Sequence, residues 1–286
     1  MSQSTTLQNA YQHCLQITRG HYENFPVASW FLPKKYRQPI SVIYAFARSA
    51  DDFADEGELD TEERLARLNH YDELLVKIQS NESVNDPIFI ALADVIKKYT
   101  LPVQLFHDLL TAFKQDVSKK RYSNFGEVME YCRYSANPVG RLLLHLYGET
   151  DFKSMAMSDA VCSALQLINF YQDISQDLEE NNRLYLPLDE MEKFHITEEL
   201  LRNKNSDFRM QNLMRLQLDR AIKLMNSGAP LGKVLKGRIG FELRMVILGG
   251  SRIAKHLFEN PDNLFARPRL TQSDLVWICW KALMVR

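Results

Sequence analysis

Apolar residues recur every three or four positions along most of this 286-residue chain, and this spacing is the strongest constraint on its fold. The period places apolar side chains on one face of an α-helix, whereas the alternation typical of strands is scarce. Prolines separate the helical stretches, because proline restricts the residue before it and tends to end helices. We therefore expect an all-α bundle of about eight or more helices. The stretches are 40–53, 65–78, 105–117, 128–147, 155–178 and 208–225, and the breaks fall at Pro33, Pro39, Pro87, Pro102, Pro138, Pro187 and Pro230.

The composition predicts one domain over residues 1–286. The chain has 11 Gly and 10 Pro and contains no Ser/Gly-rich or Pro-rich linker that would divide it. Its hydrophobic content of 45% is ample for a sizeable core. A formal net charge of -1 gives no overall attraction to nucleic acid or to an anionic membrane. Any anionic ligand must therefore be bound by local groups.

The cysteines and the two terminal segments indicate where in the cell the protein is located. Cys14, Cys132, Cys162 and Cys279 lie far apart without CxxC spacing, and the first residues are polar, which favours a cytoplasmic protein with reduced thiols. No stretch reaches the roughly 18 to 20 apolar residues that cross a bilayer. The apolar segment 275–285 predicts a last packed helix, or a helix in peripheral contact with the inner membrane surface.

One of the apolar stretches runs into a cluster of acids, Asp51, Asp52 and Asp55. Asp51 and Asp55 are four positions apart and would share one helical face, where like charges destabilise a helix by about 0.2–0.5 kcal/mol. Arg48, one turn before Asp51, is the only basic residue nearby in the sequence, and Tyr44 precedes it by a further turn. Taken alone, such a cluster is usually a solvated turn at a helix end.

A second polar series lies in the stretch 155–180, which is hydrophobic on most faces and is predicted to be a buried helix. Gln166, Asn169, Asp173 and Asp177 follow one another at spacings of three, four and four, which sets them in one line along the helix. Their oxygens suit Mg²⁺, which is held by a few carboxylates together with water and substrate phosphates. Buried amides and acids need partners, so the two clusters together predict a metal–diphosphate site.

Four ordered segments that contain these residues are similar to the squalene/phytoene synthase family of head-to-head isoprenoid synthases. The resemblance implies an all-α isoprenoid synthase fold with a deep apolar cavity and two acidic motifs on facing helices. It also implies three Mg²⁺ ions between the motifs and the diphosphate of an isoprenoid substrate. The segments are HYENFPVASWFLP (21–33), YAFARSADDFADE (44–56), YSANPVGRLLL (134–144) and QLINFYQDISQDLEENNRLYLP (166–187).

The resemblance also implies roles for individual residues. Catalysis would fall to the acids of both motifs and to a tyrosine, namely Asp51, Asp52, Asp55, Asp173, Asp177 and Tyr44. The metal ligands among the matching positions are Asp51, Asp55, Asn169, Asp173 and Asp177. Contacts to the substrate would come from Asn24, Phe25, Arg48, Tyr134, Asn137, Gln166, Asn169, Gln172 and Arg269.

Gln172 stands where carotenoid-type members of the family commonly carry an arginine. With the segment HYENFPVAS, it resembles the branch that acts in bacterial hopanoid synthesis and converts presqualene diphosphate to hydroxysqualene. Water would capture the carbocation, so NADPH would not be needed, and sister enzymes of the pathway would be partners. One alternative is the condensation of two farnesyl diphosphates to presqualene diphosphate, squalene or dehydrosqualene. Another is a noncatalytic helical binding protein, which we would expect to have lost the acids that this chain keeps.

Overall fold

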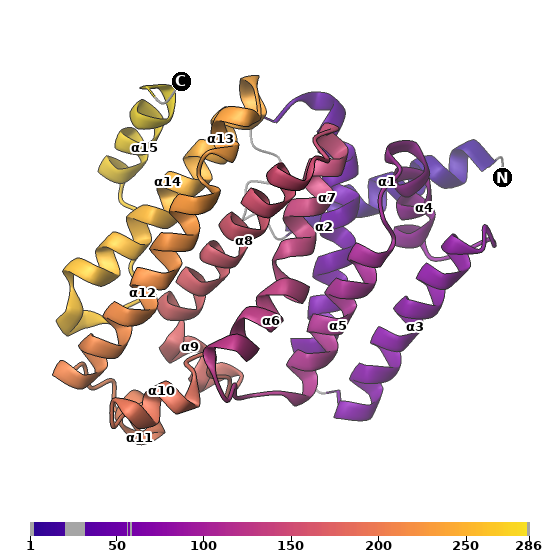
Figure 1. Cartoon of the computed structure of the whole chain (residues 1–286). Helices are drawn as coiled ribbons and strands as arrows, with labels where there is room; N and C mark the ends of the chain where they lie inside the picture. Colours follow the sequence, from indigo (N-terminus) through magenta and orange to yellow (C-terminus); the bar gives the residue numbers. More distant parts are fainter. Residues whose placement is uncertain (1–2, 21–31, 56, 58, 285–286) are drawn as a thin grey trace. The chain divides into compact units, whose positions relative to one another are not determined.

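The computed structural model describes residues 3–20, 32–55, 57 and 59–284. Within these ranges the secondary structure is helical (Figure 1), and the only β-type pairing is one isolated bridge between Arg121 and Leu184. The all-α prediction is thereby confirmed. The described residues form two compact units, unit 1 from 1–118 and 141–150, and unit 2 from 119–140 and 151–286. Each unit is described by itself, and the single domain over 1–286 stays a prediction.

Unit 1 is built around a cluster of aromatic side chains. The ring centroid of Phe46 lies 5.2 Å from that of Phe106 and 5.8 Å from that of Phe89, and Tyr71 packs on Phe89 at 4.7 Å. All four rings are buried. They come from four different helices and so fix the last turns of the helix that carries the first acidic motif. The helices of this unit are α1 (Gln3–Gly20), α2 (Lys34–Asp55), α3 (Thr61–Gln79), α4 (Pro87–Tyr99) and α5 (Gln104–Ser118).

Proline positions mark most helix boundaries as predicted, with one exception. Helix α4 begins at Pro87, and the side chain of Asp86 caps it by accepting from the backbone of Ile88 at 2.8 Å. The break predicted at Pro39 is wrong, because Pro39 lies inside α2. Because Pro39 has no backbone N–H, it cannot donate the helical hydrogen bond to the carbonyl of the residue four positions earlier. The hydroxyl of Tyr99 in α4 donates to that carbonyl, Lys35 O, at 3.4 Å.

Unit 2 is organised around α8 (Phe152–Gln172), which packs against α6, α12, α13 and α14. This agrees with the prediction of a buried central helix. Where α12 crosses α8, a Cβ atom at Gly228 would lie only 2.4 Å from the carbonyl oxygen of Met157, so the approach requires glycine. The other helices are α6 (Phe125–Ser135), α7 (Asn137–Tyr147, which ends in unit 1), α9 (Ile174–Glu180), α10 (Leu188–Lys193), α11 (Glu198–Arg202), α12 (Phe208–Gly228), α13 (Leu231–Val234), α14 (Gly237–Glu259), the 3-10 helix η1 (Pro261–Asn263) and α15 (Gln272–Met284).

The second acidic motif lies at a break that the sequence did not predict. The stretch 155–178 was expected to be one helix, but α8 ends at Gln172, and Asp173 has φ -107° and ψ 13° before α9 begins. Aspartate favours helix ends over helix interiors, because its short side chain competes for backbone groups. The backbone bonds from Asp173 N to Asn169 O (2.9 Å) and from Asp177 N to Asp173 O (2.8 Å) continue across the break. The four-residue spacing of the motif is therefore kept.

Candidate diphosphate-binding site

In unit 1, the first acidic motif is partly neutralised by Arg48. Its guanidinium lies 3.4 Å from a carboxylate oxygen of Asp51 and 2.7 Å from one of Asp52. All three side chains are half-buried, so these ion pairs are screened less than pairs in open solvent. The charge that the sequence required beside these acids is therefore present, one turn earlier on the same helix.

Tyr44 lies one turn before Arg48 on α2 and is also half-buried. Burial raises the pKa of its hydroxyl, and the charge of Arg48 opposes this effect. The hydroxyl therefore stays protonated at neutral pH and can act as a hydrogen-bond donor. Its predicted contact with substrate stays a prediction.

Arg48 is not the only base beside the first motif, contrary to the expectation from sequence. The guanidinium of Arg64 in α3 donates to the carbonyl oxygens of Phe53 (3.0 Å), Gly57 (2.8 Å) and Leu59 (3.0 Å). Gly57 has φ +78°, a conformation that favours glycine. Arg64 thus braces the turn that follows the acids. These three contacts are to backbone carbonyls, which leave no pattern of side chains in the sequence.

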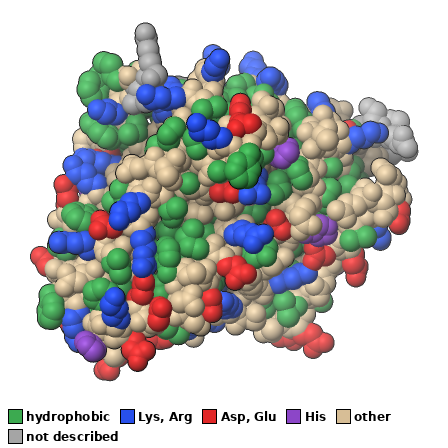
Figure 2. Space-filling view, viewed as in Figure 1, with side chains coloured by type: hydrophobic (Ala, Val, Ile, Leu, Met, Phe, Trp, Pro, Cys, Tyr) green, Lys and Arg blue, Asp and Glu red, His purple; other side chains and the backbone are tan. Residues whose placement is uncertain are grey.

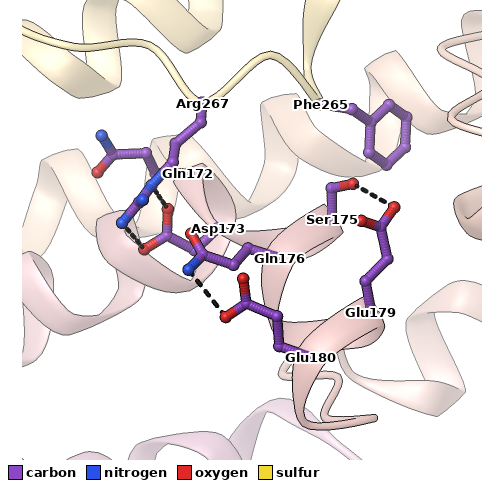
Figure 3. A pocket seen from close by; sticks show the side chains of 8 residues that line it. All are labelled: Gln172, Asp173, Ser175, Gln176, Glu179, Glu180, Phe265 and Arg267. Carbon is purple, nitrogen blue, oxygen red and sulfur yellow. Dashed lines mark hydrogen bonds and ion pairs between the residues drawn. The ribbon is translucent and has the colours of Figure 1, made fainter.

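In unit 2, the second motif is joined to the segment between α14 and α15. The guanidinium of Arg267 donates to Asp173 at 2.6 and 3.2 Å (Figure 3). The side-chain amide of Gln172 donates to Pro268 O at 2.5 Å. Residues of α9 and Phe265 line a pocket of about 390 Å³ beside these contacts. The pocket brings one cation together with three carboxylates and two side-chain amides of unit 2: Arg267, Asp173, Glu179, Glu180, Gln172 and Gln176.

Among the carboxyl groups of residues 152–180, that of Asp177 has the most perturbed pKa. Burial raises its pKa to about 7, the negative charge of Asp173 adds to the effect, and the charges of Arg183 and Arg267 oppose it. Two neighbouring carboxylates with little access to solvent repel each other when both are ionised, and a cation bound to them relieves this repulsion. The donor set of Asn169, Asp173 and Asp177 therefore fits a hard divalent cation such as Mg²⁺. Within the described ranges, no three His, Cys, Asp or Glu side chains form a metal site on their own.

The other candidates in α6 to α8 have diverse environments. Tyr134 is half-buried, with the guanidinium carbon of Arg133 5.6 Å from its ring centroid. The side-chain oxygen of Asn137 accepts from Ser163 Oγ at 2.9 Å, which ties the first turn of α7 to α8. Gln166 is half-buried, and Asn169 is exposed at the end of α8.

A late arginine, Arg267, contacts the second motif, and the diphosphate contact predicted for Arg269, which is also exposed, stays a prediction. Arg267 has φ +48°, which is uncommon for a residue other than glycine and typical of positions that the surrounding structure holds in place. It lies in an irregular segment, so periodicity gave no signal for it. Asn24 and Phe25 lie outside the described residues.

The structure thus joins Arg48 with Asp51 and Asp52 in unit 1, and Arg267 with Asp173 in unit 2. Asp55 is half-buried at the end of α2. Because the two motifs belong to different units, their approach across a deep apolar cavity stays a prediction.

The comparisons with known proteins identify the family. The sequence pattern of the family described as squalene/phytoene synthase matches residues 18–275. This chain belongs to the squalene/phytoene synthase family, and it is an enzyme of the isoprenoid synthase kind.

Among its relatives, a hydroxysqualene synthase of Rhodopseudomonas palustris is 36% identical over 256 residues, which are 89% of this chain and 85% of that protein. A phytoene synthase of Arthrospira platensis is 32% identical over 78% of this chain and 75% of its own length. The crystal structure of squalene synthase HpnC from Alicyclobacillus acidocaldarius has a TM-score of 0.84 at 35% identity, covering 91% of this chain and 97% of its own. A dehydrosqualene synthase solved with a ligand shares the fold, with a TM-score of 0.83 at 22% identity.

Proposed function

We propose that this enzyme converts presqualene diphosphate to hydroxysqualene in a Mg²⁺-dependent reaction. The observation that carries the proposal is the 36% identity to a hydroxysqualene synthase over 89% of the chain. Gln172 supports it, because a neutral amide stands where carotenoid-type members commonly have an arginine. In hopanoid synthesis, a sister enzyme would supply the cyclopropyl substrate, and another would remove the hydroxyl group from the product.

The residues that would hold Mg²⁺ are Asp51 and Asp55 in unit 1 and Asn169, Asp173 and Asp177 in unit 2. When bound, the metal ions, three in number by analogy with the family, would stabilise the charge that develops on the leaving diphosphate oxygens. The high pKa of the Asp177 carboxyl supports this assignment, since a group that ionises poorly by itself gains most from a cation.

Arginines of each unit would bind the diphosphate directly. Arg48 already lies beside the acids Asp51 and Asp52, and Arg267 lies beside Asp173, so both are within reach of a phosphate group held there. Donors that are aimed at the leaving oxygens before the reaction lower the barrier to ionisation without further rearrangement.

In the proposed reaction, the bond between carbon and the diphosphate oxygen breaks, and diphosphate departs with the electron pair. The cyclopropylcarbinyl cation opens to an allylic cation, and the oxygen of one water molecule adds to it. Loss of a proton from that water gives hydroxysqualene. No hydride enters the balance, so NADPH takes no part.

Product analysis with presqualene diphosphate and Mg²⁺ in ¹⁸O-labelled water tests the proposal. We expect hydroxysqualene that carries the label, unchanged by NADPH and abolished by EDTA until Mg²⁺ is restored. A single product, squalene, that forms only with NADPH would overturn the reaction assignment. Activity that survives thorough chelation would overturn the metal assignment.

A second candidate function is the condensation of two farnesyl diphosphates to presqualene diphosphate, squalene or dehydrosqualene. The observation that favours it is the 35% identity to a protein described as a squalene synthase. Incubation with farnesyl diphosphate alone distinguishes the two, because only the condensing activity forms a C30 product from it.

A further inference from the structure

Helix α15 carries large apolar side chains on its outer surface. Its inner side buries Ile278 and Ala282 against α14, to which it packs. On the outer side, the exposed fraction is 72% for Val276 and 53% for Trp280. None of the described helices is long and apolar enough to cross a membrane. The exposed apolar residues of this helix are Leu275, Val276, Trp277, Trp280, Leu283 and Met284.

The orientation of α15 is fixed by buried polar contacts at its start. Asp274 is 1% exposed and accepts hydrogen bonds from Arg252 and from the backbone of Thr271. His256 Nε2 lies 2.9 Å from Asp274 Oδ2, the oxygen that also accepts from Thr271 N, whereas Arg252 donates to Oδ1. These groups neutralise the carboxylate and hold its pKa well below the usual range. The apolar side chains are therefore held outward by the fold of unit 2.

A group of cations lies beside the end of α15. Arg244 donates to Ala282 O at 2.9 Å and to Gly232 O at 2.6 Å, so α13 lies next to the last turn of α15. Residues 229–241 and 275–284 contain no Asp or Glu. The corner of Figure 2 where Figure 1 draws α15 shows hydrophobic side chains among lysines and arginines. All the basic residues of these two segments are exposed. They are Lys233 in α13, Lys236 and Arg238 at the start of α14, and Lys281 in α15.

We infer that this α13–α15 surface, formed by the exposed apolar residues of α15 together with Val234, Lys233, Lys236, Arg238 and Lys281, binds the surface of an anionic lipid bilayer. Tryptophan rings prefer the boundary between headgroups and acyl chains. Apolar side chains on one helix face enter that boundary, while neighbouring cations bind anionic headgroups. The helix would lie in the plane of the membrane and would not span it.

A second copy of this chain fits the surface less well than a lipid bilayer does. In a two-fold dimer the same patch meets itself, so a cation of one copy could face only apolar or basic side chains of the other, because residues 229–241 and 275–284 supply no acid. Like charges brought together at an interface oppose association. Anionic lipid supplies the missing negative charge. The inference does not depend on the reaction that the enzyme catalyses.

Vesicle binding by the full-length protein tests the inference. Co-sedimentation would compare vesicles of phosphatidylglycerol and phosphatidylcholine in equal parts with vesicles of phosphatidylcholine alone. We expect binding to the anionic vesicles that weakens as salt is raised. Two of the chain's three tryptophans are in α15, so brominated lipids should quench its fluorescence on binding.

Substitutions separate the apolar and the charged contributions. Trp280→Glu should lower vesicle partitioning by about tenfold or more, and the pair Lys233→Glu and Lys236→Glu should weaken binding mainly at low salt. Phe208→Glu is the matched control, because Phe208 is 72% exposed at the first residue of α12, and the 21-residue length of that helix, about 30 Å, separates it from α13. Thermal melts that match the wild type would show that each variant is folded.

Several outcomes would overturn the inference. Wild-type protein that binds anionic vesicles no better than neutral ones would do so. Equal loss of binding in the Phe208→Glu control would attribute binding to general hydrophobicity. A stable dimer that Trp280→Glu converts to monomer, without vesicle binding by the wild type, would assign the surface to a second copy of the chain.

Discussion

Replacing Asp177 by asparagine should stabilise the metal-free enzyme, and by more at pH 8 than at pH 5. The carboxyl has its pKa raised to about 7 by burial and by the charge of Asp173. Because the pKa is higher in the folded protein than in the unfolded chain, protonated Asp177 favours the folded state. Its contribution to stability is fully present below the pKa of the unfolded chain, roughly 3.9, and is lost as the pH rises through about 7. An amide in this position carries no charge at any pH, so it avoids that loss.

The magnitude follows from proton linkage. Between pH 5 and pH 7 the folded protein retains a proton on Asp177 that the unfolded chain has already lost, and each pH unit then costs about 1.4 kcal/mol. Above the folded pKa the two states bind protons equally and the loss levels off. The advantage of the Asp177→Asn variant should therefore grow by at most about 2.7 kcal/mol between pH 5 and pH 8.

Urea unfolding with EDTA at several pH values between 5 and 8 measures this difference, because the chelator keeps divalent cations away from the site. Glu192→Gln is the matched control, since Glu192 is an exposed carboxylate of the same unit and loses the same formal charge. Its free energy of unfolding should follow the wild type across the range. A parallel pH dependence in the wild type and in Asp177→Asn would refute the reasoning about burial.

Three further substitutions probe catalysis and packing. Asp173→Asn should lower turnover by about 100-fold or more while the thermal melt shows a folded protein, because a ligand charge is lost; normal turnover would remove the residue from the metal site. Gln172→Arg removes the hydrogen bond to Pro268 O and adds a cation, so the product ratio should shift toward condensation of farnesyl diphosphate, and an unchanged ratio would contradict this. Gly228→Ala should cost about 1–3 kcal/mol in urea unfolding, because its Cβ would lie 2.4 Å from a carbonyl oxygen. Gly249→Ala is its control, since the nearest atom is 3.6 Å away, and it should be neutral or stabilising by about 1 kcal/mol.

Sequence patterns predicted well those features that repeat along a helix. The apolar period located α2, α3, α5 and α12, and the polar line through Asn169, Asp173 and Asp177 was found because side chains four apart share a helix face. The position of Arg48 beside Asp51 followed from the same geometry, and the structure adds its ion pair with Asp52. Interactions within one helix depend only on spacing, which the sequence states directly.

Features that depend on contacts between distant segments were not predictable in this way. The break at Asp173 is compatible with unbroken four-residue spacing, so periodicity does not reveal it. Arg267 reaches Asp173 from an irregular segment 94 positions later in the chain. Arg64 donates to three backbone carbonyls at the end of α2 and in the turn after it, and backbone carbonyls are the same at every residue. Tertiary structure decides which residues supply these contacts.

The proline inside α2 has a consequence for the order in which unit 1 folds. The carbonyl of Lys35 takes its hydrogen bond from Tyr99, 64 positions further along the chain, so the first turns of α2 complete their bonding only after α4 has docked. Local helix formation is fast, whereas a contact across a loop of that length must first close the loop. Amide protons near the start of α2 should therefore gain protection from solvent exchange together with those of α4, later than amides in the middle of α2.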